Sequence, residues 1–222
     1  MTDQITPQQF EDAGGTEDWR VLGEGACTFF STGSFGAGAR FVEAIGKLVG
    51  IDDHPPAVDV RPDGVTVRLI TQEPEFRGMT ERDVRVARQV SATARDLGLT
   101  ADPSAAQKTL LIPGAPDPAA VMPFWRALLG YDPRPDSPDE DLVDPRDRNP
   151  SLWFEQMDEP RADGGGALHV AVWVPHEQAE ARVAAALAAG GRLVRDDFAP
   201  AWWTLADAAG NEADVATTRG RN

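Results

Sequence analysis

The chain has 222 residues, 41% of them hydrophobic and 26% charged, which is typical of folded globular proteins and excludes disordered, collagen-like and disulfide-stapled classes. Its 36 acidic and 21 basic residues give a formal net charge of −15, which would repel phosphate backbones and anionic lipids, so we expect no nucleic-acid partner. No apolar run approaches the roughly 20 residues of a membrane span and the first residues lack a signal-peptide pattern, so we expect a cytoplasmic protein with no membrane partner.

The first half is predicted to be α+β, with helices packed on an antiparallel sheet. A short helix is expected in TPQQFEDAG, and one or two strands in WRVLGEGACTFF. Cys27 is the single cysteine, which excludes an internal disulfide, and we expect it to be a small buried hydrophobe. Ser34 is predicted to cap a longer helix that ends near Gly50. One apolar face of this helix is made by Phe41, Ile45 and Leu48.

A hairpin and a last helix complete the first half. AVDVR and VTVRLI alternate apolar with polar residues around the turn PDG, so their apolar side chains are expected to face one core. Thr80 is predicted to cap the last helix, and Asp83 three residues later makes a variant of the capping box. The stretch 99–107 has turn chemistry and no periodicity, so we interpret it as a linker. The prediction is therefore two domains, 1–103 and 108–222.

The second half is predicted to begin with a strand, TLLI, and a helix. Asp117 caps this helix with Pro118 at its first position, and Pro123 is expected to distort it locally. The Pro/Asp-rich segment from Tyr131 to Pro150 is interpreted as a loop, and it leads to the strand SLWFEQM. The helix residues expected to be buried are Val121, Phe124 and Leu128.

The pattern then repeats after the run DGGG, which we interpret as flexible. A strand ALHVAVWV is followed by a helix that starts near His176, and then by short strands at RLVRD, WWTLAD and ADVAT. Two similar units in tandem indicate an internal repeat in which neither unit can bury its sheet face alone.

The densest polar cluster of the first half is IDDHPP. Asp52, Asp53 and His54 lead into a strand, and Pro55 prevents a helix from continuing through them. Neighbouring carboxylates favour the cationic form of a histidine, which suits a proton carrier near neutral pH. The alternative is a solvated loop in which the aspartates only tolerate turn geometry.

The order W…FF…SF…RF…DDHPP, a hairpin, TQ, then GMTERD and a helix resembles the pterin-4a-carbinolamine dehydratase family over roughly residues 5–98. The family signature is His-His-Pro, then Thr-His, then Gly-Leu-Thr-x-x-Asp. The first of these motifs is matched here by Asp53, His54 and Pro55, and the second by Thr71 and Gln72. The third is matched by 78–83, and two of the family's three active-site histidines are absent.

This resemblance implies loss of water from a 4a-hydroxytetrahydropterin, giving a quinonoid dihydropterin. The reaction needs one proton delivered to the departing hydroxyl and one removed from the neighbouring ring nitrogen. His54 and Asp53 are expected to carry protons, and Gln72 to hydrogen-bond the pterin without titrating. Asp83 is a further candidate for the site, although a carboxylate at a helix N-terminus is already explained by capping. Pro55 and Thr71 belong to the same motifs and are expected to contact substrate.

DPAAVMPFWRALLGY, LWFEQ, ALHVAVWV and TLADAAGNEADVAT, in that order, resemble the glyoxalase-like branch of the vicinal-oxygen-chelate superfamily over residues 108–218. The resemblance implies tandem βαβββ units that curl into an open barrel. Family members that bind a metal take ligands from the first and last strand of each unit. These positions fall here on Leu110, Glu155, His169 and Asp214.

Leu110 cannot ligate, so at most one histidine and two carboxylates remain, a set that would suit Fe(II), Mn(II) or Zn(II). The alternative is that His169 is a core histidine and that both carboxylates face solvent, and we predict no metal and no cofactor. His169 and Trp203 are candidates to contact a ligand in the barrel. Of adjacent strand aromatics such as Trp202 and Trp203, one usually enters the core and the other lies at an interface.

The leading prediction is a divergent pterin dehydratase with an accessory glyoxalase-like domain. It would bind a small pterin-like ligand and form a homo-oligomer. Two other classes stay open: a non-catalytic binding or scaffold protein, and an enzyme whose active site lies in the barrel.

Overall fold

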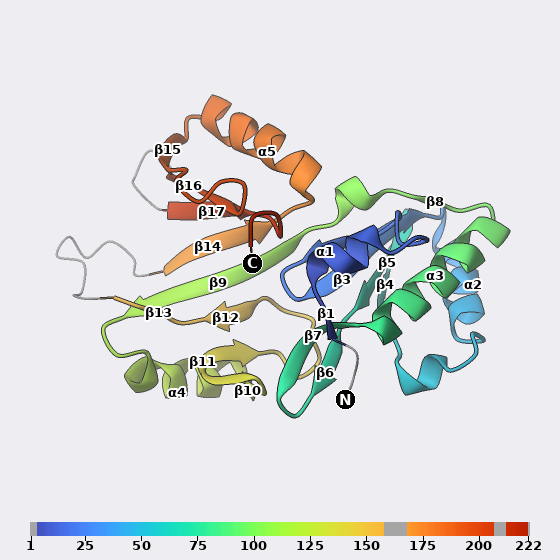
Figure 1. Cartoon of the computed structure of the whole chain (residues 1–222), viewed down its shortest axis with the longest axis horizontal. Helices are drawn as coiled ribbons and strands as arrows, with labels where there is room; N and C mark the ends of the chain where they lie inside the picture. The colour runs from blue at the N-terminus through green and yellow to red at the C-terminus, as the bar shows by residue number, and fades with distance from the viewer. Residues whose placement is uncertain (1–3, 158–167, 207–211, 222) are drawn as a thin grey trace. The chain divides into compact units, whose positions relative to one another are not determined.

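The computed structural model describes residues 4–157, 168–206 and 212–221. Within these ranges the side chains of five residues are not described: Phe124, Ala127, Leu128, Leu168 and His169. The chain divides into two compact units, Met1–Gln107 and Lys108–Asn222 (Figure 1). Each unit has its own α+β architecture, so the predicted fold class is confirmed. No helix in the described ranges is long and apolar enough to cross a bilayer.

The main sheet of the first unit is antiparallel, with described strands in the order β2-β3-β5-β4 and β8 added beside β3. The predicted hairpin pairs Val58 with Val67 and Val60 with Val65, so its apolar residues face one core as expected. The strands are β2 Arg20–Leu22, β3 Gly25–Ser31, β4 Ala57–Val60, β5 Gly64–Leu69 and β8 Thr100–Ala101.

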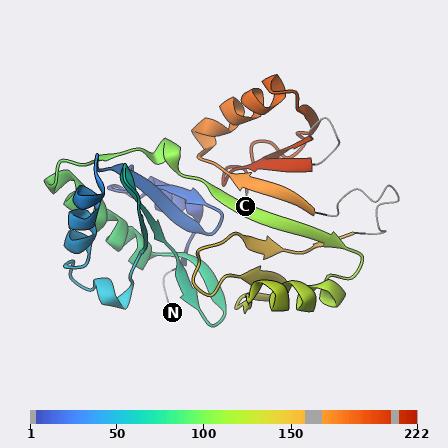
Figure 2. The ribbon, with the colours of Figure 1, turned by 180° about the vertical axis from the view of Figure 1, so that it is seen from behind.

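Helices α2 (Phe35–Ile45) and α3 (Glu81–Asp96) lie side by side against this sheet, as Figures 1 and 2 show, and α1 (Pro7–Asp12) packs near β2. They form one apolar core with the strands because each presents a stripe at helical spacing. The core includes Trp19, Phe30, Phe41, Val67, Val90 and Ala94, all nearly inaccessible to solvent.

Three features of the first unit differ from the sequence prediction. Helix α2 ends at Ile45 with Gly46 as its C-cap, four residues before the predicted cap Gly50, and Gly50 with φ 76° precedes the 3-10 turn η1 (Ile51–Asp53). The segment around EPEFR is a hairpin, β6 (Thr71–Glu73) with β7 (Phe76–Thr80), and β1 (Gln4–Ile5) pairs with β7. Part of the predicted linker forms β8, which pairs with β3.

The described strands of the second unit form a sheet in the order β10-β11-β12-β9-β14-β17-β16-β15, with β13 beside β9. The predicted repeat is present, because each half runs strand, helix and then strands, and β9 pairs antiparallel with β14 where the halves meet. The first half comprises β9 Lys108–Ala115, α4 Pro118–Leu129, β10 Asp132–Arg134, β11 Ser137–Val143, β12 Ser151–Trp153 and β13 Glu155–Gln156. The second half comprises β14 Leu168–Trp173, α5 His176–Ala188, β15 Arg192–Arg195, β16 Trp202–Ala206 and β17 Glu212–Ala216.

The Pro/Asp-rich segment 131–150, expected to be a loop, contains the strands β10 and β11. Their pairing places Leu142 and Val143 in the interior, and this burial outweighs the poor strand propensity of the prolines and aspartates around them. Helix α4 contains Pro123, yet its helical assignment is continuous from Pro118 to Leu129. The DGGG run lies outside the described residues.

Each helix of the second unit covers its own half of the sheet. Leu111, Leu142 and Leu152 pack in a cluster with Met122 of α4. The α5 cluster contains Val174, Ala179, Leu205 and Val215, with Val172 and Trp203 packed against it. Side chains alternate between the two faces along a strand. Trp173, Trp202 and Asp214 each adjoin a residue of the α5 cluster in sequence, so they lie on the face of the sheet away from α5.

Candidate functional site

His54 follows the turn η1 directly, at the entrance to the segment that becomes β4. The left-handed Gly50 (φ 76°) redirects the chain after α2. Pro55 then prevents helical continuation. The His54 side chain is 13% exposed, so its ring is held by the protein but keeps a solvent-facing part. A ring in this position can meet both a buried partner and an external ligand.

The buried partner is Asp83, in the first turn of α3, whose side chain is fully inaccessible. Nε2 of His54 lies 2.8 Å from Oδ1 of Asp83. The second carboxylate oxygen, Oδ2, accepts the backbone N–H of Thr80 at 2.8 Å and the Thr71 hydroxyl at 2.7 Å. The Thr80 hydroxyl lies 2.9 Å from the same oxygen. Asp83 therefore caps its helix, as the sequence indicated, and in addition binds His54.

Burial by itself would raise the pKa of Asp83. Hydrogen bonds from His54 and Thr71, the charge of His54 and the N–H of Thr80 outweigh burial, so the pKa of Asp83 is lowered below its ordinary value. The carboxylate is thus ionised near neutral pH and can only accept hydrogen bonds. It follows that the hydrogen in the His54–Asp83 contact is carried by Nε2 of His54.

This arrangement leaves Nδ1 of His54 as the ring nitrogen that Asp83 does not occupy. A neutral ring accepts a proton at Nδ1, and the imidazolium donates one from the same atom. A carboxylate that fixes one ring nitrogen and stabilises the imidazolium is the usual support of a histidine that moves protons. The pair can therefore serve general acid–base chemistry.

The other site residues predicted in the first unit lie around this pair. Asp53 and Pro55 are exposed, and the backbone N–H of Asp53 donates to the carbonyl oxygen of Gly50 at 3.2 Å, while its side chain has no hydrogen bond or ion pair with another described residue. Gln72 is exposed on β6, where its Oε1 accepts Nη1 of Arg77 at 2.6 Å. Thr71 is only 2% exposed, and its hydroxyl donates a hydrogen bond to the Asp83 carboxylate. The structure thus joins His54, Asp83 and Thr71 in one network and leaves Asp53 and Gln72 outside it.

Sequence reasoning missed two contributors to the first site. Thr80 was recognised as a helix cap, whereas its N–H also helps to keep Asp83 ionised. Arg77 is only 6% exposed, and its guanidinium donates a hydrogen bond to the side-chain amide oxygen of Gln72. The spacing of Gln72 and Arg77 across a tight hairpin was the available signal, but no hairpin was predicted between these two residues.

In the second unit, the predicted ligand positions lie on one face of the sheet. Leu110 of β9 pairs with Ala171 of β14, and Ala171 pairs with Asp214 of β17. Oδ1 of Asp214 accepts the Thr204 hydroxyl at 2.7 Å. Glu155 is partly buried on β13.

The His169 backbone pairs with Ile112, while its side chain lies outside the description. Among the side chains that are described, no three His, Cys, Asp or Glu residues come together as a metal site requires. The described donors therefore do not form a metal site.

Trp203 was the predicted ligand contact in the barrel, but its side chain packs in the α5 cluster. The adjacent Trp202 takes the opposite face, where it lines a pocket with Phe198 and Arg221. The one-residue difference reverses the face because strand side chains alternate. The sequence indicated that the side chains of Trp202 and Trp203 lie on opposite faces of the sheet, but not which face α5 would cover.

Comparison with known families matches residues 3–93 to the model for pterin 4 alpha carbinolamine dehydratase and residues 109–216 to the model for the glyoxalase-like domain. The chain joins a domain of the pterin 4 alpha carbinolamine dehydratase family to a glyoxalase-like domain. Both resemblances found in the sequence are thereby confirmed, and they occur in the expected order. None of the curated proteins matches the chain.

Three solved structures are each similar to about half of this chain. A crystal structure titled as an NAD-dependent benzaldehyde dehydrogenase from Legionella pneumophila has 15% identity and a TM-score of 0.37, covering 49% of this chain and 97% of that one. A solution structure of protein ATC0852 from Agrobacterium tumefaciens has 28% identity and a TM-score of 0.22, covering 48% and 92%.

A glyoxalase/bleomycin resistance protein/dioxygenase superfamily member from Vibrio splendidus 12B01 has 15% identity and a TM-score of 0.31, covering 50% of this chain and 99% of that one. None of these three likenesses bears on what the dehydratase-family domain or the glyoxalase-like domain binds.

Proposed function

We propose that the dehydratase-family domain removes water from a 4a-hydroxytetrahydropterin, with His54 as its proton carrier. The observation that carries this proposal is the contact between Nε2 of His54 and Oδ1 of Asp83 at 2.8 Å, made by a ring that remains 13% exposed. The family match supplies the reaction class, a hydro-lyase.

One histidine is sufficient to balance the protons of this reaction. The imidazolium of His54 donates a proton from Nδ1 to the 4a-hydroxyl, the carbon–oxygen bond breaks, and water leaves. The electron pair for this step comes from the neighbouring ring nitrogen, N5, which forms a double bond to C4a and becomes cationic. The now neutral His54 accepts the N5 proton, so the product is a neutral quinonoid dihydropterin and the imidazolium is restored.

Asp83 supports both halves of the cycle. Its carboxylate stabilises the imidazolium and, through the Nε2 contact, holds the ring in one orientation. Thr71 and Thr80 occupy Oδ2, which leaves Oδ1 directed at His54. In this proposal Gln72 and Pro55, which are both exposed, contact the pterin ring. The exposed Asp53 can take the place of a missing family histidine as a second proton carrier, in which case it accepts the N5 proton instead of His54.

The test is the decay of 4a-hydroxytetrahydropterin with the purified full-length chain. The wild-type protein should exceed the spontaneous rate, and His54→Ala should lose most of that excess, because a general acid or base contributes about 10²- to 10⁴-fold. A wild-type rate equal to that of buffer would refute the proposal and favour a non-catalytic binding or scaffold protein. Full activity in His54→Ala would refute the residue assignment.

A further inference from the structure

The sheet of the glyoxalase-like domain has one open edge. Among the described strands, β10 and β15 end the sheet order, so each has a neighbouring strand on one side only. β10 is poorly suited to further pairing, because Pro133 has no backbone N–H to donate and Arg134 is paired with Asp136. β15 contains no proline, and every residue from 192 to 200 is exposed. The β15 edge is therefore the accessible end of this sheet.

Apolar side chains gather at the β15 edge. Leu193 and Val194 are 42% and 40% exposed, and the pairing with β16 gives Val194 no opposite residue. Phe198, shortly after the strand, and Leu187, near the end of α5, are also exposed. Four of the nine exposed large apolar side chains in the described residues thus fall between positions 187 and 198. Single exposed apolar residues are normal, whereas such a cluster marks an interaction surface.

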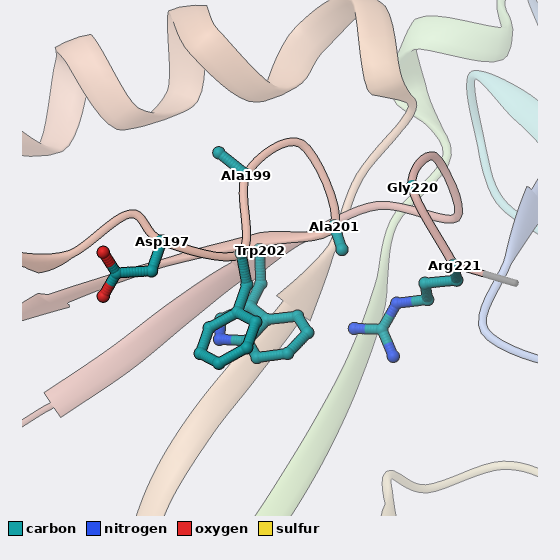
Figure 3. Close-up of a pocket in the computed structure, with 7 residues that line it drawn as sticks. Asp197, Ala199, Ala201, Trp202, Gly220 and Arg221 are labelled. Atoms are coloured by element: carbon teal, nitrogen blue, oxygen red, sulfur yellow. The ribbon is translucent and has the colours of Figure 1, made fainter.

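The segment that follows β15 is held in place by its own contacts. The N–H of Ala199 donates to the carbonyl oxygen of Asp196 at 3.0 Å. The rings of Phe198 and Trp202 stack with their centroids 4.2 Å apart. The guanidinium carbon of Arg221 lies 5.2 Å from the Trp202 centroid, as Figure 3 shows. These contacts occupy the aromatic faces beside the edge and keep Asp196 at the end of the strand.

The charged side chains of the β15 edge follow a self-complementary order. Arg192 begins the strand, and Asp196 and Asp197 follow its last residue. None of these three side chains makes a hydrogen bond or an ion pair with another described residue. The edge therefore has a positive end and a negative end, with exposed apolar side chains between them.

We propose that the β15 edge binds the β15 edge of a second copy of this chain, antiparallel, about a two-fold axis near Val194. In this arrangement Arg192 of each copy meets Asp196 and Asp197 of the other, so the same ion pairs form at both ends. The Val194 side chains of the two copies meet at the centre. A parallel arrangement would instead place like charges beside each other.

Charge favours a second copy as the occupant of this edge. The chain has a net charge of −15, so two copies repel each other unless opposite charges meet where they touch. The β15 edge supplies both signs from its own sequence. A wholly basic partner would leave Arg192 unmatched, and a wholly acidic one would leave Asp196 and Asp197 unmatched. Arg195 does not oppose the contact, because its guanidinium carbon lies 5.2 Å from the Phe198 centroid of its own chain.

The mass of the full-length chain in solution, measured by light scattering at micromolar concentration, tests this proposal. Arg192→Asp brings like charges together at both ends and should halve the mass of the assembly relative to the wild type. The double variant Asp196→Arg, Asp197→Arg should have the same effect, because it opposes Arg192. An equimolar mixture of the two variant proteins should restore the wild-type mass, since opposite charges then meet at each end. Such restoration requires that both variants are folded.

Three results would overturn the proposal without affecting the dehydratase assignment. They are a monomeric wild type, the wild-type mass in Arg192→Asp, and a mixture of the charge variants that does not regain the wild-type mass. Asp132→Arg is the control, because it reverses a charge on β10 at the other end of the sheet order. Its mass should equal that of the wild type, and a halved mass in this variant would also contradict the assignment to β15.

Val194→Ser tests the apolar centre of the contact. The dissociation constant of the assembly, measured by dilution, should rise about tenfold or more, because a two-fold contact loses the valine methyl groups of both copies. Val49→Ser makes the same chemical change at a valine of the first unit that is 89% exposed, and it should leave the dissociation constant unchanged. Equal effects of the two substitutions would place the interface elsewhere.

Discussion

His54 and Asp83 are 29 positions apart in the chain, yet Nε2 of the first lies 2.8 Å from Oδ1 of the second. The two residues belong to segments with separate local reasons for their positions. Gly50 and Pro55 fix the turn that carries His54, and Thr80 fixes the helix start that carries Asp83. Because the buried Asp83 carboxylate both caps α3 and orients His54, a change at Asp83 should affect the free energy of unfolding and the proposed dehydration rate together.

Asp83→Asn tests this coupling. The amide can still cap the helix but has lost its charge, so it neither stabilises the imidazolium nor accepts as strongly from Thr71. We expect the free energy of unfolding to fall by about 1–3 kcal/mol, as for other weakened buried networks, and the dehydration rate to fall about tenfold or more. Denaturant unfolding and the pterin decay assay measure the two effects.

Asp53→Asn is the matched control, because the same chemical change falls on an exposed aspartate of η1. Its unfolding free energy should stay within about 0.5 kcal/mol of the wild type. If Asp53 is the second proton carrier, the rate of this variant should fall while its stability does not. An unchanged rate would remove Asp53 from the mechanism and leave His54 as the only carrier.

The pH dependence of stability should report Asp83 directly. Its folded-state pKa is lowered relative to an unfolded aspartate, for which about 3.9 is usual. The contribution of Asp83 is therefore complete above the unfolded value and is lost as the pH falls through the folded value. Unfolding free energy measured from pH 6 downward should fall less in Asp83→Asn than in the wild type. Parallel curves for the two proteins would contradict the lowered pKa.

The sequence predicted the parts of the first site that depend on local patterns. Thr80 and Asp83 match a capping pattern, and His54 lies in a polar segment closed by prolines. The contact between His54 and Asp83 depends on how η1 and α3 pack, which no local pattern contains. In the glyoxalase-like domain, strands β10 and β11 were missed because burial of Leu142 and Val143 overrides the Pro/Asp-rich composition.

The pocket lined by Trp202, Phe198 and Arg221 in the glyoxalase-like domain could not be predicted from local sequence patterns either. Phe198 and Arg221 belong to segments without periodicity, and their meeting depends on Thr217 and on the turn at Gly220. Trp202 and Trp203 could be expected to face opposite ways, but the choice between them requires knowing which face α5 covers.

Metal content is a separate prediction for the glyoxalase-like domain. Leu110 supplies no ligand, and Asp214 already accepts a hydrogen bond from Thr204. We expect well below one equivalent of Zn, Fe, Mn or Ni in the purified protein, and a melting temperature that a chelator does not change. Since a ligand that binds the native state raises the melting temperature, the chelator experiment is sensitive to a modest site. One equivalent that is lost in His169→Ala would overturn this expectation.

Gln72→His tests whether the position of a missing family histidine still belongs to the site. Gln72 directly follows Thr71, whose hydroxyl binds Asp83, so a side chain at this position begins one residue from the His54–Asp83 network. Arg77, which now donates to the Gln72 amide, would disfavour the charged form of an introduced imidazole, because like charges repel. The new histidine should therefore act as a base toward the N5 proton and raise the dehydration rate.

Gln72→Asn is the control for Gln72→His, since it shortens the contact with Arg77 without adding a group that titrates. Its rate should stay near that of the wild type, while Gln72→His exceeds both. If Gln72→His is no faster than Gln72→Asn, the hairpin of β6 and β7 directs this position away from the bound pterin. The geometry of that hairpin, and not only the identity of residue 72, would then separate this domain from the family pattern.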